Sequence, residues 1–438
     1  MRLGIIIIND IGIQIALDED HILNSPGYAV VHEESIFLGE DGRARFRSLP
    51  KWTNNRFWSE LSQGALPQTC KHAKSNADLA YLHLKAIWNP LKIKPERVVI
   101  AIPSDFGQEK LGILAGICEE LEIPLTSFVD ASILEASSVN TRSEIIHLDI
   151  NLHSITLTKI FKEQTTSRVS AKKINDCGYN NFLNNWANTI ADQFIRVHRF
   201  DPFHSAKTEQ DLYDALPNFV AEFEAEAAAR FELASKQGYL ELTLAKETIV
   251  KSCAPLYQRI IEMVSSEKSF GKSTDVLLSP RFKRLPGIKD SLELIRDTQI
   301  KELEDSAVIS SINRLKDDLV LGSSEAKYFS RVASLERFEE KIEITESKAP
   351  THLLWRDRAF PIGQCFDLGV NPDAGPYKSE EPVGRIERLN SELFIEPFSG
   401  DNWELNGRPL KTKRMLSIGD QLKFNGEALV LISEIKDG

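Results

Sequence analysis

The sequence lacks three features that would each define a class of protein. Its 438 residues include only five cysteines, an odd number, with no CxxC motif or Cys/His cluster, so neither a disulfide framework nor a structural zinc site is expected. No apolar run reaches membrane-spanning length. Basic residues are not in excess, because the net charge is −11. We therefore expect a cytoplasmic protein with reduced thiols and no metal site, which binds neither nucleic acid nor membrane.

The apolar start of the chain, MRLGIIIINDIGIQIAL, is interrupted by Asn9, Asp10 and Gln14 and lacks a small-residue cleavage site. It is therefore predicted to be a buried strand hairpin and not a signal peptide. A hydrophobic content of 42% and a charged content of 27% are ordinary for a globular protein. A chain of this length is expected to form two or three domains.

Two segments have the same strand–turn–strand pattern. One is residues 3–17, with Asp10 and Gly12 in its turn, and the other is residues 144–160, with Asp149 at the end of its first strand. Equivalent hairpins about 140 residues apart predict a duplicated α/β fold with a cleft between its halves.

These hairpins resemble the phosphate-binding hairpins of the superfamily that contains sugar kinases, heat-shock proteins of 70 kDa and actin. In that superfamily, glycines follow the second aspartate, because bare backbone N–H groups must approach the phosphate. Asn151, Leu152 and His153 stand in their place here, and Ile13 replaces the hydroxyl residue expected after Gly12. The resemblance implies the fold, while these side chains obstruct its usual chemistry.

Further segments carry the same resemblance over about 320 residues. The run from Val99 to Phe106 matches the family's buried strand and its Pro-bounded turn, and Gly178 and Phe182 match a later helix start. Asp130 occupies the place of a family glutamate that helps to hold metal-bound water.

Two further family features are altered. A catalytic lysine is expected near Glu60, but no lysine occurs between Lys51 and Lys71. Residues 274–295 resemble the adenosine-binding segment at Arg284, Pro286 and Ile288, whereas residues 279–281 replace the glycine pair on which adenosine would lie.

The resemblance supplies candidate site residues. Candidate catalytic residues are Asp10, Asp130 and Asp149, and candidate nucleotide-binding residues are Gly12, Asn151, His153, Ser279 and Arg281. Each aspartate has a simpler interpretation, since Asp10 and Asp149 are typical turn residues and Asp130 is typical of a helix N-cap. His153 has no visible partner in the sequence, and a solvent-exposed histidine is the simpler expectation. Trp52, Phe57 and Trp58 are interpreted as core or domain-contact residues.

The remainder of the α/β region is expected to form a small lid subdomain and a connector. Residues 219–235 are rich in Ala and Glu and predict an amphipathic helix, followed by a strand over 239–246 and a helix over 247–264. Residues 320–350 are charged and polar and predict a connector.

Residues 351–438 predict an all-β domain, with short strands and turns at Asn406-Gly407, Gly419-Asp420 and Asn425-Gly426. The segments 405–410 and 416–424 resemble a forkhead-associated domain. Such a domain reads phosphothreonine through an Arg and a Ser on adjoining loops, because a dianion requires charge-assisted donors. Candidate partner-binding residues are Arg385, Ser391 and Asn406, although Arg385 and Ser391 are too close in sequence for the family spacing.

The predicted domains are an actin-like lobe over 1–142, a second lobe over 143–319, a connector over 320–350 and a β-sandwich over 351–438. The leading functional hypothesis is a degenerate heat-shock-70-like protein that acts as a protein-interaction or regulatory module, with little or no ATPase activity and no required cofactor. The alternative is a working ATP-dependent chaperone-like ATPase that uses ATP or ADP with Mg²⁺. A sugar phosphotransferase of the same superfamily is a third hypothesis, against which the Val99–Phe106 segment and the missing hexose motifs count.

Overall fold

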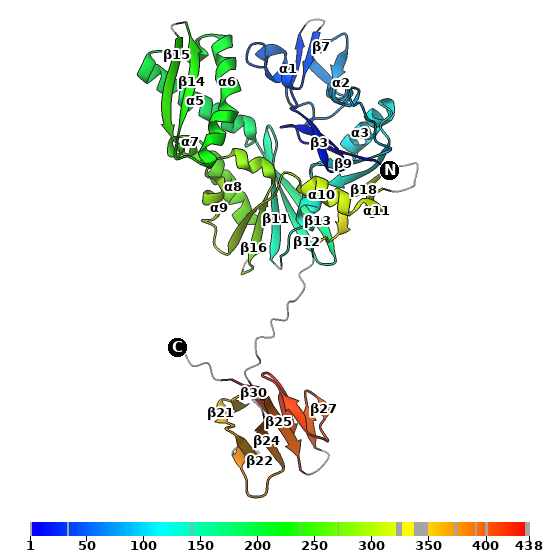
Figure 1. Ribbon diagram of the computed structural model, residues 1–438, viewed down its shortest axis with the longest axis vertical. Coiled ribbons are helices and arrows are strands. Elements are labelled where there is room, and N and C mark those ends of the chain that lie inside the picture. The colour runs from blue at the N-terminus through cyan, green and yellow to red at the C-terminus, as the bar shows by residue number, and fades with distance from the viewer. Residues whose placement is uncertain are drawn as a thin grey trace. The chain divides into compact units, whose positions relative to one another are not determined.

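The computed structural model describes residues 2–32, 35–141, 143–236, 238–269, 271–320, 326–336, 349–371, 375–389, 392–398 and 402–433. Its contacts divide the chain into two units, Met1–Phe338 and Glu339–Gly438. The first unit is mixed α/β with several sheets, and the second is all-β (Figure 1). Within the described residues, no helix is both long and apolar enough to cross a membrane.

The first central sheet of the α/β unit has the strand order β18-β10-β9-β1-β2-β3. Its strands are β1 (Leu3–Ile7), β2 (Ile13–Leu17), β3 (Asp20–Ser25), β9 (Arg97–Ile102), β10 (Leu125–Asp130) and β18 (Lys327–Phe329). All five residues of β1 are buried, as expected for an Ile-rich central strand covered on both faces. β1 runs antiparallel to β2 and parallel to β9, so the turn after β1 lies beside the carboxyl end of β9.

The second central sheet has the order β17-β16-β11-β12-β13-β19. Its strands are β11 (Glu144–Ile150), β12 (Ser154–Lys162), β13 (Thr165–Asn175), β16 (Thr274–Leu278), β17 (Thr298–Glu302) and β19 (Arg331–Ala333). β11 is antiparallel to β12 and parallel to β16, which is parallel to β17. The first five strands in chain order therefore have the same neighbours and directions in both sheets.

Part of the predicted connector is structured. β18 pairs in parallel with β10 of the first sheet, and β19 pairs antiparallel with β13 of the second. Residues 327–333 thus add one strand to each sheet, and Val332 is buried in the core that they share with Val129 and Ile309. The prediction of a connector was wrong for these residues, because a polar composition does not prevent an edge strand from pairing.

Helices cover the two sheets, and the upper parts of this unit combine helices with the small sheets that contain β14 (Ala228–Ser235), β15 (Gly238–Ala245) and β7 (Ala65–Cys70) (Figure 1). The longer ones are α2 (Asn76–Trp88), α3 (Gln108–Glu120), α5 (Tyr179–His198), α6 (Ala206–Ala221) and α8 (Ala254–Glu267), and the shorter ones include α1 (Glu40–Arg43), α4 (Ala131–Ser137), α7 (Lys246–Ser252), α9 (Ile288–Leu292), α10 (Ala307–Arg314) and α11 (Lys316–Leu319). Small additional sheets are formed by β4 (Ala29–His32), β5 (Ser35–Leu38) and β6 (Thr53–Asn54), and by β7 (Ala65–Cys70) and β8 (Ala73–Ser75). Phe57 and Trp58 are fully buried, as expected.

The predicted helix over 219–235 was wrong. α6 ends at Ala221, and Ala228–Ser235 forms β14, which pairs with β15 (Gly238–Ala245). Alternate residues of β14, namely Ala229, Phe231 and Leu233, are buried in the hydrophobic core beneath this strand. Burial with a period of two residues outweighs the helix propensity of Ala and Glu.

The second unit consists of two packed antiparallel sheets, ordered β21-β20-β30-β29-β26-β27 and β23-β22-β24-β25-β28. Its strands are β20 (His352–Trp355), β21 (Arg358–Pro361), β22 (Cys365–Asn371), β23 (Gly375–Lys378), β24 (Gly384–Leu389), β25 (Glu392–Pro397), β26 (Trp403–Leu405), β27 (Arg408–Pro409), β28 (Arg414–Leu416), β29 (Gln421–Phe424) and β30 (Glu427–Ile432). The turns at Asn406-Gly407 and Asn425-Gly426 are confirmed, and all four residues have positive φ. Leu353, Trp403 and Leu429 lie in the core between the sheets.

Candidate functional site

The two predicted hairpin turns of the α/β unit contact each other directly. The Asp10 carboxylate accepts a hydrogen bond from the backbone N–H of Leu152 at 2.6 Å. The side-chain amide of Asn9 donates to Ile150 O at 3.0 Å and to the Asp149 carboxylate at 3.1 Å. The structure therefore brings Asp10 and Asp149 together, and each carboxylate accepts a hydrogen bond from a residue of the other hairpin.

The predicted nucleotide-binding residues Ser279 and Arg281 both bond to Asp149. The Ser279 hydroxyl donates to the carboxylate at 2.6 Å, and the Arg281 guanidinium donates at 3.0 Å. Asp149 and Arg281 are both largely buried, with side chains 13% and 12% exposed. Both donors are therefore engaged by a carboxylate within the protein.

The Asp10 side chain is buried in an environment that disfavours its charge. It is 3% exposed, and its second carboxylate oxygen has no hydrogen-bond partner among the described residues. Burial raises the pKa of Asp10 to about 7. Near neutral pH this carboxyl group is therefore about half protonated in the metal-free protein.

Little space remains beside Asp10. The cavity there has a volume of about 10 Å³ and is lined by residues that include Asp10, Asp105, Asn151 and Lys173. This is the volume of roughly one water molecule by the same measure. The residues present therefore do not fit a Mg²⁺–triphosphate group in this conformation.

Lys173 lies at this site but was not predicted from the sequence. It lines the cavity beside Asp10, and its ammonium group lies 2.8 Å from the Asp105 carboxylate. The lysine was expected near Glu60, which is exposed in the structure. Lys173 lies on β13, opposite Thr156. Its position near the end of the third strand of this sheet is the only sequence feature that could have indicated that it lies beside Asp10.

The turn of the second hairpin also binds the start of α5. The backbone N–H groups of Tyr179 and Asn180 donate to Asn151 O and Leu152 O, each at 2.9 Å. A Cβ added to Gly178 would lie 2.3 Å from Ser154 N. The helix N-terminus, which often binds anions, is thus occupied by the hairpin itself.

His153 is half-buried, and the expectation of a solvent-exposed histidine was wrong. Its Nε2 lies 2.9 Å from Asn55 Oδ1. Burial, followed by the nearby charge of Arg56, lowers the pKa of His153 to about 4, so the imidazole is neutral at pH 7. It bonds the turn to Asn55, and no ion pair with a carboxylate is found for it among the described residues.

Gly12 and Asp130 have structural roles. A Cβ on Gly12 would lie 2.0 Å from Oδ1 of the exposed Asn24 side chain, so a larger residue here would displace that side chain. Asp130 caps α4 by accepting from Ser132 N at 3.0 Å, which confirms the predicted N-cap. Its carboxylate also accepts from the Ser104 hydroxyl at 2.7 Å and lies 3.3 Å from Arg168.

A larger cleft of about 470 Å³ opens next to the hairpins. Its lining includes the aromatic residues Tyr28, Phe46 and Tyr213 and the cation Arg284, which was expected at an adenosine site. A contact joins two lining residues of the cleft, since the Arg43 guanidinium donates to the Asp214 carboxylate at 3.3 Å. The three aromatic rings pack edge to face, Tyr28 against Phe46 and Phe46 against Tyr213. The Arg284 guanidinium lies over the ring of Tyr179, which also lines the cleft.

The second unit engages its predicted partner-binding residues internally. The Arg385 guanidinium bonds to Asp367 at 2.6 Å, and its side chain is 41% exposed. The Asn406 side chain accepts from Gln421 N at 2.9 Å and donates to Asp420 at 2.8 Å, which fixes the turn. Ser391 lies outside the described residues.

Among the described residues, no group of three or more His, Cys, Asp or Glu side chains is placed to hold a metal ion. No protein-family model matches this sequence, and a search of curated proteins finds no significant match.

Proposed function

We propose that the first unit has the duplicated fold of the actin-like ATPases, in the heat-shock-70-like form, and acts as a protein-interaction or regulatory module with little or no ATPase activity. The shared strand order of the two central sheets supports the fold, because each places a β-hairpin first and adds two parallel strands beside it.

The observation that carries the functional proposal is the hydrogen bond from Leu152 N to Asp10. A phosphate loop must present free N–H groups to its anion. In this protein the Asp10 carboxylate accepts such an N–H group, and the Asp149 carboxylate accepts hydrogen bonds from Ser279 and Arg281. The first N–H groups of α5 donate to carbonyl oxygens of the second hairpin turn. Phosphoryl transfer depends on several donors that contact the phosphates at once, so a site whose donors are all bonded within the protein should not catalyse it.

The alternative, a working chaperone-like ATPase, is favoured by a different observation. The cleft of about 470 Å³ is intact, and Lys173 supplies a cation beside Asp10. In this alternative the two hairpins separate to admit Mg²⁺ and the phosphates, and the cleft holds the base.

Calorimetric titration of the full chain with Mg-ATP, Mg-ADP and adenosine separates the two hypotheses. The degenerate site predicts no heat that depends on Mg²⁺ or on the phosphates, so any adenosine binding would equal that of the nucleotides. Tight binding that requires both Mg²⁺ and the γ-phosphate would support the alternative and overturn the leading proposal.

We also propose that the all-β unit docks a protein partner in the cytoplasm, as its resemblance to forkhead-associated domains suggests. The bond between Arg385 and Asp367 favours docking without phosphothreonine, because the guanidinium already has a carboxylate partner. Binding of the isolated partner before and after phosphatase treatment tests this, since a phosphothreonine reader would lose its ligand and a constitutive module would not.

A further inference from the structure

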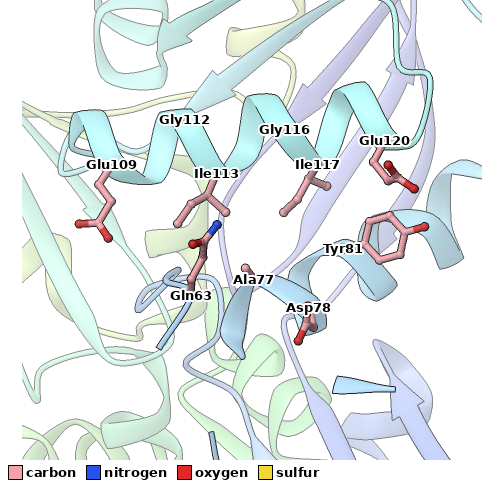
Figure 2. Close-up of a pocket in the computed structure, with 10 residues that line it drawn as sticks. All are labelled: Gln63, Ala77, Asp78, Tyr81, Glu109, Gly112, Ile113, Gly116, Ile117 and Glu120. Carbon is pink, nitrogen blue, oxygen red and sulfur yellow. The ribbon is translucent and has the colours of Figure 1, made fainter. Parts of the chain in front are cut away.

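The α/β unit carries a groove that plays no part in the hairpin site. It lies between α2 and α3 and has a volume of about 690 Å³ (Figure 2). Its lining consists of Gln63, Ala77, Asp78, Tyr81, Glu109, Gly112, Ile113, Gly116, Ile117 and Glu120. Ile113 and Ile117 point from α3 toward Ala77 and Tyr81 on α2 and form an apolar floor (Figure 2).

Glycines open the wall of this groove. Gly112 and Gly116 are one turn apart on α3 and exposed, and a Cβ added to either would have no neighbour within 4 Å. Glycine in a helix interior lowers helix stability, and no crowding by the described residues requires it here. The absence of side chains lets the backbone of another helix approach closely, as small residues do at helix–helix contacts.

The charged lining is of one sign. Asp78, Glu109 and Glu120 are acidic, and none of the ten described lining residues is cationic. Lys110, the neighbour of Glu109, turns away and donates to Ser59 O at 2.7 Å. Lys85 contacts the Tyr81 hydroxyl at 3.4 Å, outside the lining.

Glu119 and Glu120 also stand in the last turn of α3, which contains no basic residue. Negative charge at a helix C-terminus is unfavourable, because the helix dipole is negative there. A cation from a partner that reached Glu120 would relieve this repulsion. The placement therefore favours a positively charged occupant.

We propose that this groove binds an amphipathic helix of another protein, with a narrow Leu/Ala face flanked by Lys or Arg. Glu109 and Glu120 lie at opposite ends of the groove and are eleven residues apart on α3 (Figure 2). Eleven residues of helix span roughly 16 Å, about three turns, so flanking cations at that spacing would meet both carboxylates. The recognition is of the helix-in-groove type.

This inference names a partner class for the interaction module proposed above, but it does not rest on the nucleotide site. Failure of the groove experiment would leave the calorimetric result unchanged, and nucleotide turnover would leave the groove unchanged. The two proposals therefore fail separately.

The probe is a fluorescein-labelled peptide of 21 residues with Leu and Ala on one helical face and Lys on both flanks. Its binding to the full chain is measured by fluorescence anisotropy at two salt concentrations. A scrambled peptide of the same composition lacks the amphipathic period, so it measures attraction by charge alone. We expect the scrambled peptide to bind at least about tenfold more weakly.

Three variants test the groove itself. Gly116→Leu fills it and should weaken binding at least about tenfold, while the paired change Glu109→Gln and Glu120→Gln should weaken binding severalfold and reduce its salt dependence. Glu119→Gln removes the same charge from the same turn but outside the lining, so it should leave affinity within about twofold. Circular dichroism confirms that each variant is folded.

Equal binding by the scrambled peptide, unchanged binding by Gly116→Leu, or no binding by the wild-type chain would each overturn the proposal. Sedimentation of the chain alone is the further check. A dimer that Gly116→Leu abolishes would show that a second copy of this chain occupies the groove, which also overturns the proposal of a separate helical partner.

Discussion

The carboxylate of Asp10 accepts the backbone N–H of Leu152, although the two residues are 142 positions apart in the chain. Each lies in the turn of a β-hairpin that begins one of the two central sheets. The bond joins the two hairpin turns, and the cavity left beside Asp10 has a volume of only about 10 Å³.

Asp10→Asn should remove a pH dependence of folding. The pKa of Asp10 rises from 3.8 to about 7 on burial, so the folded state binds a proton that the unfolded state releases. The contribution of Asp10 to the free energy of unfolding is most favourable below pH 4, is lost as the pH rises toward 7 and stays lost above pH 7. Denaturant unfolding at pH 5 and pH 8 should show the wild type losing on the order of a few kcal/mol relative to the asparagine variant. Parallel pH profiles for the two proteins would contradict the account.

Gly178→Ala should be strongly destabilising. Its Cβ would meet backbone atoms of His153 and Ser154 at 2.3 to 2.4 Å, which cannot move without displacing the hairpin turn. We expect a loss of about 3 kcal/mol or more in the free energy of unfolding. Gly112→Ala is the matched control, because its Cβ enters open space in a helix and should stabilise by about 0.5–1 kcal/mol. Similar effects for the two changes would show that the close approach is not tight.

His147→Gln should destabilise the unit by leaving a buried carboxyl group without its ionic partner. His147 and Glu135 form a pair with side chains 2% and 3% exposed. Burial alone would lower the pKa of His147, but the Glu135 carboxylate outweighs it and raises that pKa. The pair therefore stabilises fully below about pH 6.5 and less as the pH rises through the folded value. We expect a loss of about 3–5 kcal/mol at pH 6 by denaturant unfolding.

The double variant Glu135→Gln and His147→Gln is the control for that experiment. Removing both charges should recover part of the stability, because no uncompensated charge remains buried. A double variant no more stable than His147→Gln would show that packing, and not charge, sets the cost.

Truncation should locate the stabilising role of the two edge strands. A chain ending at residue 336 keeps β18 and β19, and a chain ending at residue 320 loses both. The shorter chain exposes the edges of β10 and β13 and uncovers the site of Val332, so its unfolding free energy should fall by a few kcal/mol. Equal thermal unfolding midpoints for the two chains would contradict a structural role for residues 327–333.

The sequence predicted those parts of the fold that depend on local chemistry. The Ile-rich start forms a buried hairpin, Asp130 caps a helix, and the two Asn-Gly pairs form turns with positive φ. In each case the physical cause lies within a few residues, so a single sequence contains it.

The parts that the sequence did not predict depend on distant contacts. The segment around Phe231 has the composition of a helix, but it pairs as a strand because a lobe core buries every second residue. Lys173 reaches Asp10 only through the register of β13. The hydrogen bond between Asp10 and Leu152 could not be predicted either, since the sequence shows that glycines are missing but not which group accepts the N–H.

The most direct test of the closed hairpin site is release of phosphate from ATP by the full chain at saturating Mg-ATP, compared with a chain that carries Asp10→Ala and Asp149→Ala. The account predicts the same background rate for both proteins, because the wild-type site holds no Mg²⁺–phosphate group. Steady turnover by the wild type that the paired substitution abolishes would contradict it and would assign Asp10 and Asp149 to a working ATPase.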